Sequence, residues 1–477
     1  TTEVRRTEAA AQSDEVLIVR PGSDAALALG LMHVLIAEGL CDREFVAQHT
    51  IGFDALAAHV RPYSPEWAAA ETGLAASTIV ALARRYGTTR PAMIVLGGSS
   101  MHKGGQGWRG ARAVSCLPAL TGNLGIAGGG LGPRHGSKGH GHGLADISEP
   151  ERRPPGRYVP NQMSRVTEAL EDGTVRALWL FGTDMLSSYA DVARVERALA
   201  RQELIVSYEL FWNETARRFA DIVLPSTAWV EELGCKATNT HLYLMEPALP
   251  PAGQARTGAW VLRGLAERLG VADFYPWTGD EGPLEAILDH PATGHATVAA
   301  LRAESGRRAL NVSPVGHPTR VFPTPSGKVE LYSARAESLG LPPLPVPEAP
   351  PPSRFPLSLR QGRTLGHFHG FYDHGRALPS LAALEPGPAL WISPADAAAR
   401  GVADGADIRV FNERGEMRCR ALVTDRVPAR TVWMRDGWDG LNRLTAGESC
   451  IPDAAVDVFG FSAGQAAFDA AVEVAPA

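Results

Sequence analysis

Apolar residues in the first half of the chain form short runs that predict strands separated by helices. Most of these runs end at a turn containing glycine or proline, which is typical of buried strands in an α/β fold. The predicted strands comprise residues 16–19, 92–96, 177–181, 204–207 and 222–224. Because helical segments separate the strands, we expect parallel pairing and a ligand at the carboxyl ends of the strands.

Three helices are predicted from apolar residues that recur at helical spacing. The first begins behind a Ser23 or Asp24 cap, and the second covers residues 77–86. The residues expected to face inward are Leu27, Leu31, Val34 and Leu35 in the first helix, Ile79, Leu82 and Ala83 in the second, and Val192, Val195 and Leu199 in the third.

A proline-rich stretch at residues 341–356 contains eight prolines and predicts a semi-rigid linker at a domain boundary. The pattern beyond it is that of a β protein. Residues 407–411 and 416–421 alternate between apolar and polar and flank a glycine-containing turn, which predicts a hairpin. A strand is expected at 355–359, and a short helix at 394–400 behind a Ser393 cap.

The composition fits a globular protein and narrows its function. Lys plus Arg is 46 and Asp plus Glu is 52, so the formal net charge is −6, which argues against a nucleic-acid coat. Five cysteines without a CxxC pattern exclude a zinc ribbon and an iron–sulfur cluster within this sequence. Their odd number also disfavours a disulfide framework and fits a reducing compartment. No apolar run approaches eighteen residues, so no membrane span is predicted.

The segment 128–143 has eight glycines in sixteen residues, together with Arg134, His135 and Lys138. Such a density of glycine indicates close approach of the backbone to a large ligand. Cationic contact with an anionic cofactor or substrate would explain the basic residues. Its three histidines could instead ligate a metal, although a glycine-rich loop holds them poorly, and an ordinary flexible loop is the third alternative.

Other motifs carry less information when taken singly. The turns at 97–100 and 182–184 could admit a phosphate, and the Arg- and His-containing stretch 360–369 suits phosphate or pterin recognition. The GxSxG pattern at 460–464 has no histidine after it, so a hydrolase elbow is not predicted. The GxGxxG pattern at 105–110 lacks the strand and acid of a dinucleotide fingerprint.

Several further motifs, taken together, identify a family. They are RRTE at 5–8, RPGSDAA at 20–26, LTGNLG at 120–125, ETA at 214–216, ADIVLP at 220–225, ELG at 232–234 with Asn239, TPSGK at 324–328, GR to His at 362–369, and NRLT at 442–445. In this order they resemble the molybdopterin oxidoreductases of the dimethyl sulfoxide reductase family. That family includes formate dehydrogenases, nitrate reductases and thiosulfate or polysulfide reductases.

The resemblance implies an iron–sulfur domain, two related Rossmann-like α/β domains and a C-terminal β-barrel of the double-psi type. We therefore expect an incomplete α/β domain at 1–137, a second at 138–340, the linker at 341–356 and the barrel domain at 357–477. The implied cofactor is molybdenum or tungsten held by two molybdopterin guanine dinucleotides. A [4Fe-4S] cluster and the Ser, Cys or selenocysteine metal ligand are expected upstream, because the sequence starts without methionine and looks truncated.

The resemblance also implies roles for particular residues. It assigns Glu3, Arg5 and Asp24 to the guanosine end of one cofactor, Gly98 and Ser99 to its pterin or phosphates, Gly182, Asp184, Glu209 and Asn239 to the other cofactor, and Arg363, Leu365, His367 and Asn442 to the barrel side of the pterins. No residue of this sequence is expected to ligate the metal.

One departure from the family pattern concerns the loop that enters the active centre. Formate dehydrogenases carry Arg, Gly and Gln there, whereas this sequence has His135, Gly136 and Ser137. We therefore expect His135 to be catalytic toward a small substrate other than formate. We also expect an electron-transfer subunit as a partner and a cytoplasmic location. A formate dehydrogenase-like enzyme with an altered pocket, and a non-catalytic scaffold subunit of an electron-transfer complex, are the alternatives.

Overall fold

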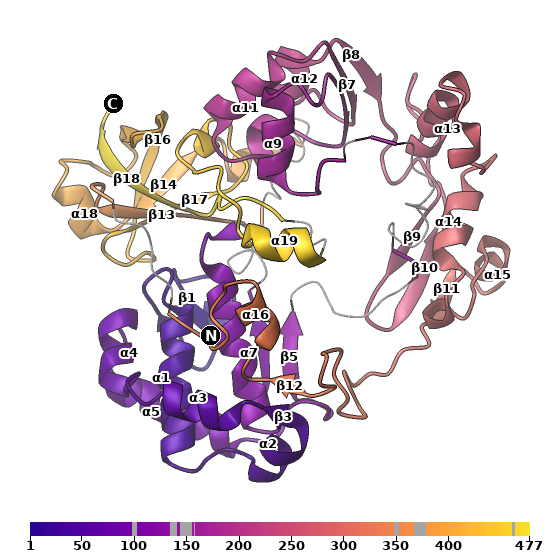
Figure 1. Cartoon of the computed structure of the whole chain (residues 1–477). Helices are drawn as coiled ribbons and strands as arrows, with labels where there is room; N and C mark the ends of the chain where they lie inside the picture. The colour runs from indigo at the N-terminus through magenta and orange to yellow at the C-terminus, as the bar shows by residue number, and fades with distance from the viewer. Residues whose placement is uncertain are drawn as a thin grey trace.

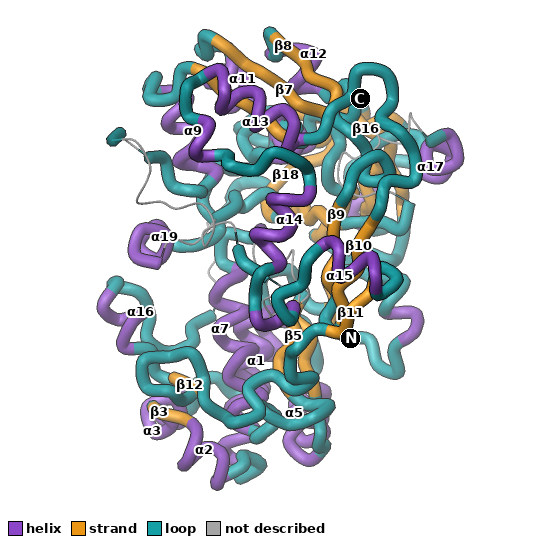
Figure 2. Tube along the Cα trace, turned by 90° about the vertical axis from the view of Figure 1, so that its right-hand side faces the viewer, coloured by secondary structure: helices purple, strands orange, loops and turns teal. Residues whose placement is uncertain are grey.

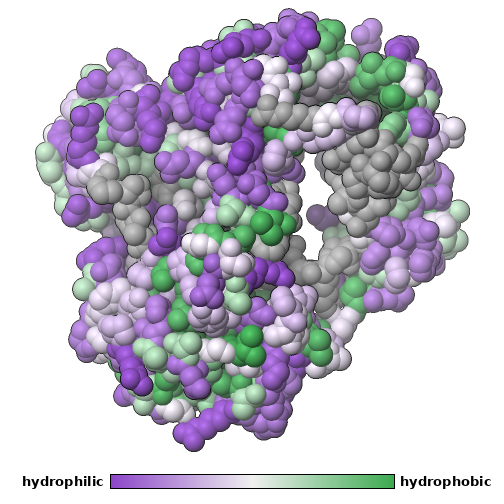
Figure 3. Space-filling view, viewed as in Figure 1, coloured by the Kyte–Doolittle hydropathy of each residue, from purple (hydrophilic) through white to green (hydrophobic). Residues whose placement is uncertain are grey.

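The computed structural model describes residues 1–97, 103–133, 141–143, 155–156, 158–347, 353–366, 378–459 and 463–477. A first α/β unit, a second α/β unit, a small mixed lobe and a β-barrel surround a central opening (Figure 1). The space-filling view shows the same opening between the barrel side and the small lobe (Figure 3). The predicted α/β class with a C-terminal barrel is confirmed.

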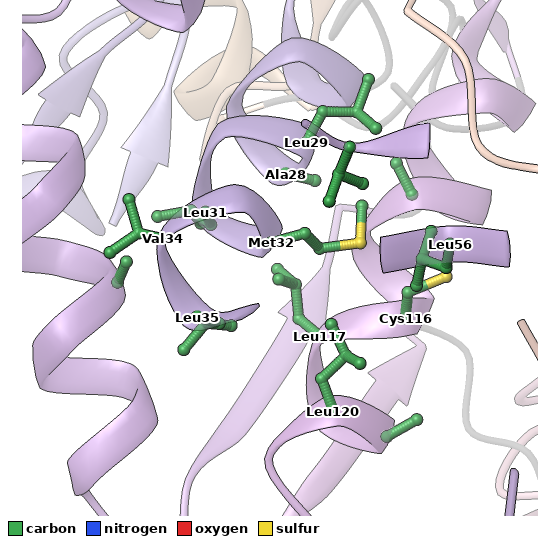
Figure 4. Packing of buried hydrophobic residues seen from close by; sticks show 14 of the residues in the cluster. Ala28, Leu29, Leu31, Met32, Val34, Leu35, Leu56, Cys116, Leu117 and Leu120 are labelled. Atoms are coloured by element: carbon green, nitrogen blue, oxygen red, sulfur yellow. The ribbon is translucent and has the colours of Figure 1, made fainter. Parts of the chain in front are cut away.

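The first unit packs around helix α1 (Asp24–Ala37), which is buried on nearly all sides. The predicted inward residues are buried, but so are Ala28, Leu29 and Met32 on other faces. The one-sided expectation was therefore incomplete, because α1 lies in the middle of its unit. Figure 4 shows α1 side chains close to Cys116, Leu117 and Leu120. The other helices of the unit are α2 (Arg43–His49), α3 (Phe53–His59), α4 (Pro65–Thr72), α5 (Ala76–Thr88) and α7 (Gly107–Leu120).

Strand β4 (Met93–Leu96) pairs in parallel with β5 (Gly130–Pro133). The expectation that β4 is buried was wrong for one face, since Met93 is 56% and Val95 is 69% exposed. Side chains alternate along a strand, so only Ile94 of this stretch packs against the core of the unit. Strand β5 uses the start of the glycine-rich segment, which the sequence pattern presented as a loop.

The chain returns to the first unit before it enters the barrel. Strand β12 (Val329–Glu330) pairs with β3 (Thr50–Ile51), and Phe322 and Leu331 join the core around α1. The predicted domain limits did not include this return, which the sequence pattern does not reveal. The remaining elements here are β1 (Thr2–Glu3), β2 (Leu17–Ile18) and α16 (Ala334–Ser338), and β1 and β2 pair in parallel.

The second unit contains the parallel sheet β6–β7–β8, as predicted. Val192, Val195 and Leu199 are buried against it, also as predicted. The strands are β6 (Ala177–Phe181), β7 (Leu204–Glu209) and β8 (Ile222–Pro225), and the helices are α9 (Met163–Glu171), α10 (Met185–Ser188), α11 (Val192–Leu199) and α12 (Glu214–Phe219).

A small lobe lies between the two α/β units when the molecule is viewed from the side (Figure 2). Its antiparallel sheet β9–β10–β11 encloses a separate core that includes Leu242, Leu288 and Leu301. The elements are β9 (Gly234–Ala237), β10 (His241–Met245), β11 (Arg307–Ala309), α13 (Gly258–Arg268), α14 (Glu281–Leu288) and α15 (Val298–Ala303).

The barrel is closed in the order β13–β17–β14–β16–β15–β18. The predicted hairpin is confirmed as β15 and β16, and the Ser393 side chain caps α18 as expected. The predicted strand at 355–359 lies two residues further on, as β13. The bounds are β13 (Leu357–Gly362), α17 (Pro379–Leu384), β14 (Ala389–Ile392), α18 (Pro394–Ala398), β15 (Asp407–Phe411), β16 (Glu416–Val423), β17 (Thr431–Arg435), α19 (Asp453–Phe459) and β18 (Asp469–Pro476).

Candidate functional site

Three predicted residues meet at the carboxyl edge of the sheet in the second unit. Gly182 follows β6 with a φ of +58°, and its amide donates to the Tyr208 carbonyl over 3.0 Å. A Cβ built on Gly182 would have no neighbour within 4 Å among the described residues, so its surface is open to a ligand. Asp184 and Glu209 lie beside this turn, and the charge of Asp184 acts on the Glu209 carboxyl. The edge therefore combines an exposed backbone turn with two acids.

The two acids differ in how the protein satisfies them. The Asp184 carboxylate accepts hydrogen bonds from the Thr215 hydroxyl (2.5 Å) and the Thr215 amide (3.2 Å). By contrast, Oε1 of Glu209 is buried without a hydrogen-bond partner among the described residues, although hydrogen bonds from Thr183, Asn213 and Leu210 to the same carboxyl lower its pKa. Burial raises the pKa of both carboxyls above their ordinary values, and the Asp184 charge raises the pKa of Glu209 further. Glu209 thus presents an unused acceptor that an N–H or O–H of a ligand could satisfy.

The raised pKa of Glu209 predicts that this residue lowers the stability of the cofactor-free chain at neutral pH but not at acidic pH. A carboxyl with a raised folded pKa favours folding at acidic pH, and that contribution is lost as the pH rises through its folded value. We expect Glu209→Gln to stabilise the cofactor-free chain by about 0.5 kcal/mol at pH 7, allowing for partial exposure, and to have no effect near pH 4. Urea titrations at both pH values measure this difference.

Glu203→Gln provides the control for that measurement. Glu203 lies in the same unit, but its hydrogen bond to Arg176 lowers the pKa of its carboxyl. This exposed variant should not become more stable at pH 7. A Glu209→Gln variant that is less stable than the parent at pH 7 would contradict a raised pKa of Glu209 in the folded chain.

A cavity of about 350 Å³ lies next to the same edge, and its residues stand outside the motifs of the sequence. The Tyr208 hydroxyl on β7 donates to the Arg256 carbonyl over 2.8 Å, which ties the cavity to the strand that ends at Glu209. The lining comprises Pro251, Arg256, Thr257, Trp260, Arg263, Gly279 and Asp280. The sequence signal that could have revealed the cavity is Arg256, followed by the helix cap Thr257 and, one turn later, by Trp260.

The chemistry of the cavity suits a planar polar group with a nearby anion. The Arg256 guanidinium lies 5.7 Å from the centroid of the Trp260 ring, which is about half exposed. The Thr257 hydroxyl donates to the Asp280 carboxylate over 3.2 Å and so fixes an acceptor in the wall. An indole face stacks on a base, a carboxylate accepts from base N–H groups, and a guanidinium binds phosphate.

Asn239 does not join this group in the structure. It is exposed in the loop between β9 and β10 of the small lobe. Its assignment to a cofactor stays a prediction.

In the first unit, Glu3 is the last residue of β1 and Asp24 is the first residue of α1. Glu3 ends β1, where its carboxylate accepts a hydrogen bond from the Thr7 hydroxyl over 3.2 Å. Asp24 begins α1, and burial raises the pKa of its carboxyl while the charge of Arg360 opposes that shift. Arg360 belongs to β13, so a charged residue of the barrel lies near the Asp24 carboxyl.

Arg5 makes contacts that the sequence did not predict. Its guanidinium lies 4.2 Å from the Trp433 ring and 5.0 Å from the Trp391 ring, both in the barrel. It also donates to the Arg363 carbonyl over 3.2 Å, and the side chain is 7% exposed. Burial lowers the pKa of Arg5, although the adjacent rings and carbonyl remain good partners for a cation. Arg5 therefore joins the N-terminal segment to the barrel.

The barrel residues fall into two environments. Asn442 is buried, and its amide donates to the Ser187 carbonyl over 2.7 Å, which links the barrel to the second unit. Leu365 is 88% exposed, in the segment that follows β13 and Arg363. Gly98, Ser99, His135 and His367 lie outside the described residues. Their predicted roles stay predictions.

No group of three or more His, Cys, Asp or Glu side chains among the described residues is arranged to hold a metal ion. None of the helices found in them is both long and apolar enough to cross a membrane.

The chain is similar to known proteins over nearly its whole length. The family model described as molybdopterin oxidoreductase matches residues 4–268, and the one described as Molydopterin dinucleotide binding domain matches residues 357–458. "Probable oxidoreductase YoaE" of Bacillus subtilis (strain 168) is 32% identical over 96% of this chain and 68% of its own length. Dimethyl sulfoxide reductase DmsA of Escherichia coli (strain K12) is 28% identical over 90% of this chain and 61% of its own length.

A solved structure supports the same fold. Acetylene hydratase from Pelobacter acetylenicus superposes with a TM-score of 0.80 over 100% of this chain and 73% of its own, at 22% identity. The chain thus spans about two thirds of the length of the relatives that it matches.

Proposed function

Because this chain belongs to the molybdopterin oxidoreductase family, we propose that it is the dinucleotide-binding part of an enzyme that moves two electrons to or from a small substrate. The proposed cofactor is molybdenum or tungsten held by two pyranopterin guanine dinucleotides, and the bound metal would supply the redox chemistry. The observation that carries the proposal is the buried, unsatisfied Oε1 of Glu209 beside the open turn at Gly182. An acceptor of this kind fits a guanosine donor.

We propose that the second unit binds one dinucleotide along its carboxyl edge. The backbone at Gly182 admits the pyrophosphate, and Glu209 accepts from a ribose hydroxyl. Asp184, already held by Thr215, keeps the turn in place. The cavity at Trp260 and Asp280 takes the guanine, with the indole stacked on its face and the carboxylate opposite its N–H groups.

The other dinucleotide belongs, in this proposal, to the first unit and the barrel. Glu3 and Asp24 accept from its guanosine end, and Arg5 holds the Arg363 segment in place through the Arg363 carbonyl. Asn442 keeps the barrel against the second unit. These residues bind and orient, while the electron path, a [4Fe-4S] cluster and the metal ligand would come from elsewhere in the enzyme. An electron-transfer subunit and a cytoplasmic location complete the proposal.

Nucleotide and metal analysis tests the proposal directly. The complete enzyme that contains this chain is purified from cells grown with molybdate or tungstate, and acid-released nucleotide and bound metal are measured per enzyme molecule. We expect close to two guanine nucleotides per metal ion. The proposal would be overturned if the purified protein contained no guanine nucleotide while a related molybdoenzyme in the same cells contained its cofactor.

The barrel assignment predicts a loss of cofactor when Arg363 is replaced by alanine. A charge-assisted hydrogen bond contributes about 1.5–3 kcal/mol, so Arg363→Ala should lower guanine nucleotide and metal content together. Arg354→Ala, in the segment just before β13, serves as the control. Unchanged content in Arg363→Ala would remove this residue from the cofactor site. His367→Ala carries the same expectation from the sequence.

A further inference from the structure

A short piece of the glycine-rich segment lies against the C-terminal end of α14. The His142 amide donates to the Ile287 carbonyl over 2.8 Å. Nε2 of the same imidazole lies 2.8 Å from the Asp289 carbonyl. A carbonyl only accepts, so Nε2 carries the hydrogen in this contact. One residue therefore makes two hydrogen bonds to the end of one helix.

Gly141 lets this contact form. Its φ is +148°, and a Cβ built there would lie 2.6 Å from the Ile287 carbonyl oxygen. No real side chain is tolerated at that distance from backbone, so the close approach requires glycine. The glycine before His142 thus has a steric role in the small lobe.

The contact satisfies carbonyls at the end of a helix. The last carbonyls of an α-helix have no partner within the helix and need donors from outside. Ile287 is in the last turn of α14 and Asp289 is the first residue after it, and His142 supplies a donor to each. Donors at a helix C-terminus are also favoured by the helix dipole.

Other titratable side chains lie around the His142 imidazole, but their hydrogen bonds go to other partners. His290 meets His142 edge to face, with 5.1 Å between ring centroids, and its Nδ1 accepts from the Ala292 amide. The Asp289 carboxylate is paired with His295 over 2.6 Å, so the Asp289 carbonyl is the part of that residue that meets His142. Within the described residues, these groups form a cluster of three histidines and one aspartate around a backbone anchor.

We propose that His142 is a positioning residue that anchors the chain between β5 and α9 to the small lobe. That stretch connects the first unit to the second, and β5 and α9 belong to different units (Figure 1). The inference rests on the proposed function, because His135, the expected catalytic residue, precedes the anchor by seven residues. Seven extended residues span at most about 25 Å, so the anchor limits the reach of that stretch.

Hydrogen–deuterium exchange of the full chain tests the anchor. We expect His142→Ala to speed exchange at residues 141–143 by tenfold or more and to loosen the amides that follow α14. His142→Gln keeps an N–H donor near the position of Nε2 and should restore most of the protection. Gly141→Ala should loosen the same region although the imidazole is intact. His295→Ala, from the same cluster, is the matched control and should leave 141–143 unchanged.

Two results would overturn the anchor. One is equal exchange at 141–143 in His142→Ala and the parent. The other is loosening by His295→Ala as large as that caused by His142→Ala. Hydrogen–deuterium exchange is measured on the cofactor-free chain, so its result does not depend on the proposed function. The proposed function is tested separately, by nucleotide and metal content. Unchanged nucleotide and metal content in His142→Ala is expected, because His142 contacts the C-terminal end of α14 and not the residues that line the Trp260 cavity.

Discussion

Replacement of Arg435 by methionine is expected to lower the free energy of unfolding by about 3 kcal/mol. The Arg435 side chain is 3% exposed at the end of β17, and its Nε lies 2.8 Å from a Glu385 carboxylate oxygen. The guanidinium also donates to the Asp436 carbonyl and lies 4.2 Å from the Trp438 ring. Removing one partner of a buried pair leaves the other charge uncompensated. The estimate is at the lower end of the usual range because Glu385 keeps 20% of its surface in water.

Urea unfolding followed by tryptophan fluorescence measures this effect, since several tryptophans lie in the barrel. Arg409→Met is the matched control, because its partner Glu416 lies 3.2 Å away and both side chains are about half exposed. Exposed pairs contribute about 0–1 kcal/mol, so the control should change little. The double variant Arg435→Met, Glu385→Leu should regain part of the loss. Equal effects of Arg435→Met and Arg409→Met would contradict the burial argument.

The elements that the sequence predicted correctly are strands whose pairing depends on residues close to them in the chain. Strands β6 and β7 were predicted because apolar runs and turns have a local signature, and their parallel pairing follows from the helix between them. The β15–β16 hairpin was found because its turn and alternation are both local. In these cases a window of about ten residues contains the decisive information.

Long-range packing explains what the sequence did not reveal. Helix α1 is enclosed because helices α4, α5 and α7 pack against it, and no periodicity within α1 can show that. Strand β12 joins β3 from almost 280 positions away, and the small lobe has its own core from scattered segments. Met93 and Val95 were expected to be buried because an apolar run cannot reveal which face of its sheet is covered.

The candidate site was predictable to a similar extent. Gly182, Asp184 and Glu209 meet because the ends of neighbouring parallel strands share one edge, a rule that applies to any α/β sheet. The assignment of Arg5 to a cofactor stays a prediction, and the sequence did not reveal that its guanidinium faces two barrel tryptophans 386 and 428 positions away. The Trp260 cavity was missed for the same reason, since α13 and Asp280 reach the edge only through tertiary contacts.

His135→Ala is expected to reduce turnover of the enzyme about 10²–10⁴-fold, the usual contribution of a general acid or base. The reason lies in the sequence: the family resemblance implies that His135 takes the place of a substrate arginine of formate dehydrogenases, and Arg134 and Lys138 are near it in the sequence. A histidine can hold and release a proton near neutral pH, whereas an arginine stays charged. This difference predicts a substrate other than formate that exchanges a proton during the reaction.

The measurement needs a substrate, which screening of nitrate, thiosulfate, sulfoxides and formate with an artificial electron carrier should provide. The pH dependence of kcat is then compared between the parent, His135→Ala and His140→Ala, a control from the same glycine-rich segment. The His135→Ala profile should lose one ionisation, because the group that titrates is gone. Turnover within about twofold of the parent with an unchanged profile would make His135 an ordinary solvated histidine, and efficient formate oxidation by the parent would refute the substrate argument.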